Sequence, residues 1–167
     1  MKAVADATPL IHLGKIGKLI CLKKLFDKII IPKEIYFEIM AKDKEHKNNE
    51  MLIIETLINE KFIEIADSPE GLNFLGLDSG ELKAMSLCQK LKIKTILIDE
   101  KEGFDVASIL GLKPVRTTSL LLILLNKKLI SFLEYEKNLL NLSKSGYFMS
   151  AATYKILLDA GKNMNKR

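Results

Sequence analysis

The sequence predicts an α/β domain with a mainly parallel β-sheet, for three reasons. Short apolar runs of strand length alternate with amphipathic segments of helix length. The composition, 48% hydrophobic and 28% charged, is that of a globular protein and excludes a disordered one. A chain of 167 residues can bury a core of its own, and no internal repeat divides it. We therefore expect one domain over residues 1–160 and a polar, frayed tail at 161–167.

Five segments are predicted as strands because each is short, apolar and bounded by charged or turn-forming residues. They lie at residues 2–6, 28–31, 62–66, 95–98 and 113–116. The third alternates apolar and polar residues, as a strand at the edge of a sheet does. The fourth is the most apolar and is expected to be buried.

Helical spacing of apolar residues predicts the remaining elements. Thr8 is the expected N-cap of the first helix, with Pro9 in its first position. Gly14 and Gly17 are expected to divide the segment that ends at residue 26 into two short helices. Further helices are predicted at 33–41, 51–59, 77–91, 101–110, 117–126, 131–142 and 150–160, with Ser150 capping the last. Residues 42–49 are expected to form a loop or an exposed helix start, and residues 68–76 a loop.

The net charge of +5 comes mostly from lysine, since arginine occurs only at positions 116 and 167. Such a charge mildly favours an anionic partner such as RNA or DNA. Taken alone, it is explained more simply by a lysine-coated surface, and no cluster resembles a basic nucleic-acid-binding arm.

Cysteine and histidine usage argues against disulfide-linked and zinc-binding classes. Cys21 and Cys88 lie in apolar, helix-like contexts, which indicates buried thiols in a reducing compartment. His12 and His46 have no metal-binding spacing to the cysteines or to each other. The start of the chain has no signal-like apolar core, and the apolar stretch at 120–125 is far too short to cross a bilayer. We expect a cytoplasmic protein with no membrane partner.

Asp6 and Asp99 each follow a predicted strand, and ligands of parallel α/β folds bind beyond the carboxyl ends of strands. Each also has a simpler explanation. Asp6 suits a turn, and Asp99 could cap the next helix through a box-like spacing to Glu102. However, two adjacent acids after a buried strand, Asp99 and Glu100, are also a usual way to present metal ligands.

Glu38 and Glu81 lie on predicted helices. Glu38 shares a stripe with Ile35 and Ile39, where a carboxylate is costly unless it is paired or bound to a cation. Equally, it can sit at the edge of the stripe and reach water. Glu81 fits a capping box with Asp78, yet it also begins the buried face of its helix.

The four acids at positions 6, 38, 81 and 99 all fall at predicted strand ends or on inward helix faces. Their similar placement favours one shared site. Carboxylates in one crevice raise one another's pKa unless a cation neutralises them. Oxygen ligands select Mg²⁺ or Mn²⁺, and such sites can activate water at a phosphodiester. The chain contains no dinucleotide-binding, P-loop or nucleophile-elbow motif that would indicate other chemistry.

Several motifs occur in a particular order and spacing: Asp6-Ala7-Thr8-Pro9-Leu10-Ile11, the Pro32, Glu38 and Ile39 helix, Leu77-Asp78-Ser79-Gly80-Glu81, Leu97-Ile98-Asp99-Glu100, the leucine-rich helix after Thr118, the turn at 127–130 and the segment 146–149. Together they resemble the PIN-domain family and, more narrowly, its branch of small VapC-like prokaryotic proteins. The resemblance covers nearly the whole chain.

The resemblance implies a three-layer α/β/α fold with an acidic pocket that binds Mg²⁺ or Mn²⁺ and cleaves RNA. By position, the catalytic and metal-binding acids would be Asp6, Glu38, Glu81 and Asp99, with Glu100 as an alternative to Asp99. Thr8 resembles the family's hydroxyl residue that hydrogen-bonds within the pocket. Family members often act as toxins whose partner is a small antitoxin protein, and they commonly form homodimers.

Two positions depart from the branch: Phe104 stands where Arg is usual, and Arg116 where Gly is common. The exchange leaves the substrate contacts open, with Arg116 as one candidate. The leading hypothesis is a metal-dependent endoribonuclease, the toxin of a toxin–antitoxin pair. The alternative is a non-catalytic PIN-like module that binds RNA or protein. A receiver-like domain that accepts a phosphoryl group is a third possibility, less consistent with the many helices between residues 11 and 59.

Overall fold

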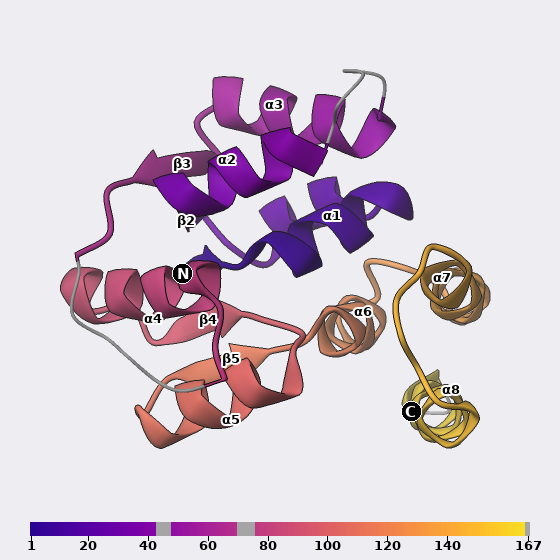
Figure 1. Ribbon diagram of the computed structural model, residues 1–167. Coiled ribbons are helices and arrows are strands. Elements are labelled where there is room, and N and C mark those ends of the chain that lie inside the picture. The colour runs from indigo at the N-terminus through magenta and orange to yellow at the C-terminus, as the bar shows by residue number, and fades with distance from the viewer. Residues whose placement is uncertain (43–47, 70–75, 166–167) are drawn as a thin grey trace. The chain divides into compact units, whose positions relative to one another are not determined.

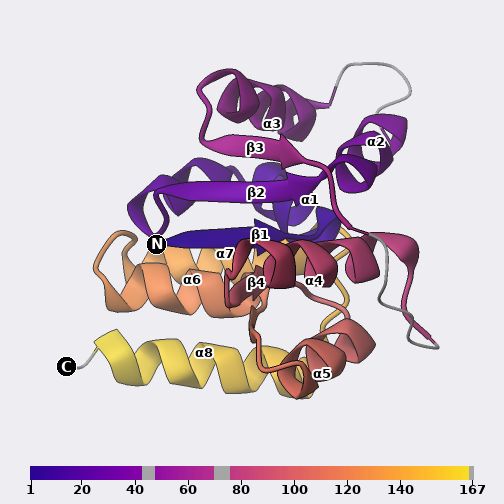
Figure 2. The same ribbon diagram turned by 90° about the vertical axis from the view of Figure 1, so that its left-hand side faces the viewer.

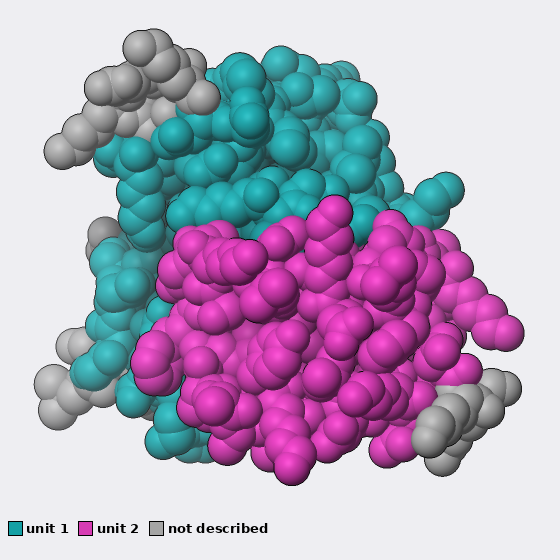
Figure 3. Space-filling view, turned by 90° about the vertical axis from the view of Figure 1, so that its right-hand side faces the viewer, with its two compact units in different colours: residues 1–116 teal, residues 117–167 magenta. Residues whose placement is uncertain are grey.

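The computed structural model describes residues 1–42, 48–69 and 76–165 (Figure 1). Contacts within the chain define two compact units, residues 1–116 and 117–167, which have different colours in Figure 3. Unit 1 contains the β-sheet, and the described part of unit 2 is helical.

Unit 1 is built on a five-stranded parallel sheet with the order β3-β2-β1-β4-β5. The strands are β1 (Lys2–Ala5), β2 (Lys28–Pro32), β3 (Ile63–Ala66), β4 (Thr95–Leu97) and β5 (Lys113–Val115). These are the predicted strands to within a residue at each end, and β3 lies at an edge as its alternation predicts. β1 pairs with β2 and β4, whereas the first strand of a receiver-like domain lies between the second and third, so the receiver-like alternative is wrong.

Side chains alternate between the two faces of this sheet, and helices cover both faces. Val4, Ile30 and Ile96 belong to a buried cluster that includes the apolar side of α4 (Ser79–Leu91). The alternate residues, such as Ala5 and Ile31, are fully buried toward the other face. Figures 1 and 2 show α4 on one side of the sheet and α1 on the other, which confirms the predicted α/β architecture.

The other helices of unit 1 follow the predicted order: α1 (Ala7–Lys15), the 3₁₀-helix η1 (Leu19–Lys24), α2 (Lys33–Lys42), α3 (Asn49–Asn59) and α5 (Lys101–Ile109). One predicted cap is wrong. α1 begins at Ala7 with Asp6 in the N-cap position, so Thr8 lies inside the first turn. Pro9 tolerates this position because the amide it lacks would have no partner in the first turn of a helix. The predicted loops at 42–49 and 68–76 lie mostly outside the described residues.

Unit 2 consists of α6 (Thr117–Asn126), α7 (Phe132–Lys144) and α8 (Ala151–Asn165). The Tyr135 hydroxyl donates to the carbonyl of Leu157 at 2.8 Å, and Gly161 leaves room for the Tyr135 ring, so α7 and α8 are held together. The Ser150 hydroxyl accepts from the amide of Thr153 at 3.0 Å, which confirms the predicted cap of α8.

The end of α8 corrects the predicted frayed tail, because the helix continues past Ala160 to Asn165. Packing of Gly161 against the Tyr135 ring explains this extension of a polar segment. Within the described ranges, no helix is both long enough and apolar enough to span a bilayer.

Candidate active site

The carboxyl edge of the sheet brings together acids that are far apart in the sequence. The amide of Asp6 donates to the carbonyl of Leu97 at 2.9 Å, continuing the pairing of β1 with β4 beyond Ala5. Asp99 and Glu100 follow β4 on the same edge. The strands run from left to right in Figure 2, so this edge is at the right.

Asp6 is the most strongly perturbed of these acids, with a side chain only 4% exposed. Burial first, and then the nearby carboxylates of Asp78, Glu38 and Glu81, raise the pKa of its carboxyl to about 7. A hydrogen bond from the amide of Ala7 opposes this shift. These effects show that acids from α2 and α4 face the end of β1.

Glu81 is also buried, with 4% exposure, and its two oxygens have different environments. Oε2 accepts from the amide of Asp78 at 3.2 Å, and Asp78 Oδ1 accepts from the amide of Glu81 at 2.8 Å, which confirms the predicted capping box. Oε1 is buried and has no hydrogen-bond partner among the described residues. The pKa of Glu81 is raised by burial, and then by the charges of Asp78, Glu100 and Glu102.

Gly103 explains how the Glu81 carboxylate fits beside α5. A Cβ atom at this position would lie 3.0 Å from Glu81 Cδ and 2.5 Å from Ile98 Cδ1, and it would overlap Glu81 Oε1. The absence of a side chain at Gly103 therefore makes room for the carboxylate between α4 and α5.

Glu38 lies at the edge of the apolar stripe of α2. Its side chain is 38% exposed and forms an ion pair with Lys42 at 2.7 Å, one turn further along the helix. Its other oxygen approaches Gly80, because a Cβ there would lie 3.3 Å from Glu38 Oε2 and 3.3 Å from Asp78 Oδ1. Carboxylates from two helices therefore converge on the backbone at the start of α4.

Asp78 is the residue that sequence reasoning missed, because capping explains it completely. In the structure its carboxylate both caps α4 and contributes to raising the pKa of Asp6. Its place at a helix start facing the carboxyl edge of a parallel sheet is the signal that could have identified it.

The residues that follow β4 differ from their predicted capping role. The N-cap of α5 is Glu100, without a side-chain capping bond, so Asp99 does not occupy the N-cap position that the capping explanation required. Glu100 acts on the site through its charge, which raises the pKa of Glu81. Thr8 is half-buried in the first turn of α1.

The donor set suits a hard divalent cation in its chemistry. It consists of carboxylates, and it includes a buried oxygen that has no hydrogen-bond partner in the described part of the chain. It also contains an acid whose pKa is raised by burial and like charges. As they lie, no three acids, cysteines or histidines among the described residues are close enough together to hold a metal ion.

Arg116 directly follows β5, and β5 pairs with β4, the strand that Asp99 and Glu100 follow. Its guanidinium carbon is 4.2 Å from the centroid of the Phe104 ring, a cation–π stack. Thus the two positions that depart from the VapC-like pattern are in contact with each other.

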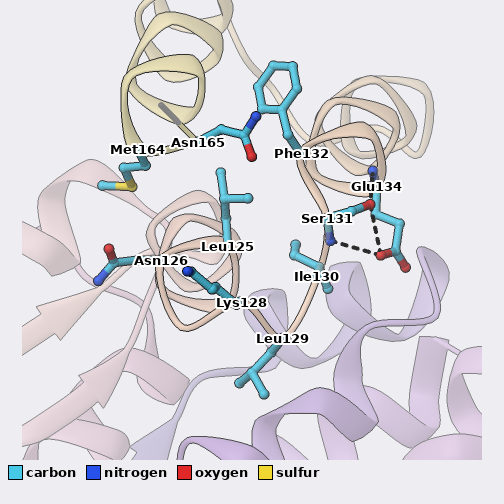
Figure 4. A pocket seen from close by; sticks show the side chains of 10 residues that line it. All are labelled: Leu125, Asn126, Lys128, Leu129, Ile130, Ser131, Phe132, Glu134, Met164 and Asn165. Carbon is cyan, nitrogen blue, oxygen red and sulfur yellow. Dashed lines mark hydrogen bonds between the residues drawn. The ribbon is translucent and has the colours of Figure 1, made fainter. Parts of the chain in front are cut away.

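A cavity of about 440 Å³ lies in unit 2, and none of these acids lines it (Figure 4). It is lined mainly by the turn between α6 and α7 and by the end of α8. Its one acid, Glu134, is held in the capping box of α7 with Ser131. The cavity therefore offers no second acidic site.

The fold and the acids at the carboxyl edge of the sheet define a class of protein, an α/β domain with an acidic site at the ends of its strands. Comparison with known proteins agrees with this class. A family model described as a PIN domain matches residues 2–162, which span both units. The chain belongs to the PIN-domain family. PIN domains have a nuclease-type fold and generally use divalent metals. Searches of curated proteins and of solved structures found no match.

Proposed function

We propose that the protein is an endoribonuclease that depends on Mg²⁺ or Mn²⁺ and hydrolyses RNA phosphodiesters. The supporting observation is the pair of buried carboxylates, Asp6 and Glu81. Asp6 has a pKa of about 7, and Glu81 has an oxygen with no hydrogen-bond partner among the residues that the structure describes. A divalent cation would neutralise the buried charge of Asp6 and bind the buried oxygen of Glu81. In a PIN domain such a site favours hydrolysis of nucleic acid.

In this proposal Asp6 and Glu81 bind the cation, and Glu38 and Asp99 complete the set, with Glu100 as the alternative to Asp99. When bound, the cation supplies an activated water and neutralises charge that develops on the phosphate. An acid that does not bind it directly would accept a hydrogen bond from the attacking water and orient it. The hydroxyl of Thr8 would hydrogen-bond a neighbouring carboxylate of the pocket.

The biological role we propose is that of a cytoplasmic toxin, a homodimer that a small antitoxin protein neutralises. Its support is the VapC-like order of motifs from Asp6 to Glu100. A small reading frame beside the gene, whose product binds the protein and blocks RNA cleavage, would support the pairing. Light scattering on the purified protein tests the dimer.

The activity is tested by incubating the purified protein with structured RNAs in Mg²⁺, in Mn²⁺ and in EDTA. We expect cleavage that EDTA abolishes. Asp6→Asn and Asp99→Asn should each lower the rate by at least about 100-fold, because each removes a ligand charge. Asp105→Asn is the matched control, since its exposed side chain lies on α5 and pairs only loosely with Lys101, at 3.9 Å.

Cleavage that persists in EDTA, or equal cleavage by the Asp6 and control variants, would contradict the proposal. RNA binding without any metal-dependent cleavage would instead support the non-catalytic module.

A further inference from the structure

The stacked pair of Phe104 and Arg116 has no part in the proposed metal site, yet it lies beside that site. Val115 of β5 pairs with Leu97 of β4, and its carbonyl accepts from the amide of Ile98 at 3.1 Å. The next residue, Arg116, is therefore level with Ile98, one position before Asp99. It lies on the β5 side of the acids at the same edge of the sheet.

Phe104 is itself firmly placed. Its ring packs against the buried cluster that contains Ile98 and Ala107. Its amide donates to the carbonyl of Glu100 at 2.9 Å in the first turn of α5. The ring therefore holds the guanidinium 4.2 Å away in one place, and less side-chain freedom remains to be lost when Arg116 binds a ligand.

Stacking on Phe104 covers one face of the guanidinium and leaves the N–H groups at its edge available to a ligand. The five N–H donors of arginine lie in its plane, so a ring against one face covers none of them. Within the part of the chain that the structure describes, the guanidinium of Arg116 stacks on the Phe104 ring.

We propose that Arg116, held by Phe104, binds a phosphate of the RNA backbone beside the phosphate that is cut. This inference rests on the proposed function. A planar fork of donors matches two oxygens of one phosphate. β5 is two strands from β1, and strands are spaced about 4.8 Å apart. The backbone of Arg116 therefore lies about 10 Å from that of Asp6 across the sheet, a separation that suits a phosphate next to the scissile one.

The test measures RNA binding in EDTA, so that it does not depend on cleavage. Affinities for short single-stranded RNAs of several base sequences are measured over a range of salt. We expect Arg116→Ala to weaken binding about 5- to 10-fold for every sequence and to reduce the slope of log affinity against log salt by about 1. Phe104→Leu keeps the charge and the apolar filling but removes the ring, and should weaken binding about 3-fold without changing the slope.

Lys113→Ala is the matched control. It removes the same charge from the same strand, but Lys113 is exposed at the opposite end of β5. Its effect on RNA affinity should be less than 2-fold, because salt screens a distant surface charge. The Debye length at 0.1 M salt is about 10 Å. If Arg116→Ala does not fold, Arg116→Lys replaces it, with about 3-fold weaker binding expected because the planar fork is lost.

Equal losses for the Arg116 and Lys113 variants would overturn the inference while leaving metal-dependent cleavage intact. A loss limited to one base sequence would also overturn it, since a phosphate contact carries no sequence preference. If the unaltered protein neither binds nor cleaves RNA, the proposed function itself fails.

Discussion

Asp6 sits where the folded state disfavours its charge. Its pKa rises from 3.8 to about 7 in the fold, first through burial and then through neighbouring carboxylates. Because the folded-state pKa is the higher one, the protonated form stabilises the fold. This contribution is fully present below about pH 4 and is lost as the pH rises through about 7.

Asp6→Asn should therefore stabilise the metal-free protein at pH 8 and leave it nearly unchanged at pH 4. The shift corresponds to about 2–4 kcal/mol at pH 8. Urea unfolding in EDTA at several pH values measures it, with Asp105→Asn as the exposed control. A variant that is equally destabilised at both pH values would show that Asp6 acts through its hydrogen bonds and not through its buried charge.

At the scale of elements, α4 and α7 carry the same capping box, with different surroundings. Asp78 and Glu81 cap α4, and Ser131 and Glu134 cap α7. Asp78→Ala and Ser131→Ala should each cost about 1 kcal/mol of unfolding free energy through loss of the cap. Asp78→Ser should recover most of that loss.

A measurement of metal binding distinguishes the roles of the two capping boxes, because of these two only the box of α4 contains an acid of the proposed site. The affinity for Mn²⁺, measured by calorimetry, should fall in both Asp78 variants and stay unchanged in Ser131→Ala. An unchanged affinity in Asp78→Ser would show that Asp78 is a cap alone.

Gly103 joins α5 to the site by leaving room for the Glu81 carboxylate. Alanine favours a helix by about 1 kcal/mol over glycine. Gly103→Ala should nevertheless lower the melting temperature, because overpacking against Glu81 and Ile98 costs about 1–3 kcal/mol. It should also weaken Mn²⁺ binding, whereas Asp105→Ala on the exposed side of α5 should change neither. A stabilised Gly103→Ala protein would mean that the carboxylate moves aside freely.

The order of strands and helices was predictable because apolar runs and helical spacing reflect burial directly. The residues at which strands and helices begin and end were less predictable. Thr8 is a good N-cap by type, but Asp6 occupies that position because β1 ends at Ala5, one residue earlier than predicted, and α1 begins directly after Asp6. The last helix passes Ala160 because Gly161 packs on the Tyr135 ring, a contact that no local pattern reveals.

At the scale of the whole molecule, the sequence located the acids but not their interactions. Asp6 and Glu81 could be chosen from strand ends and helix faces, whereas the contribution of Asp78 to the Asp6 pKa depends on how α4 meets the sheet. In the same way, the sequence showed Phe104 and Arg116 as two separate departures from a family pattern. In the fold, β5 pairs with β4, and Arg116 stacks on the Phe104 ring.

Proton release couples the site to the whole molecule, since a cation at Asp6 must displace its proton. With a pKa of about 7, Asp6 is about half protonated at pH 7, so Mn²⁺ binding should release about half a proton there, nearly one at pH 6 and almost none at pH 8.5. Calorimetric titration in buffers of different ionisation enthalpy measures this number. Binding without any dependence on buffer at pH 6 would remove Asp6 from the ligands, because a carboxylate that stays protonated does not bind the ion.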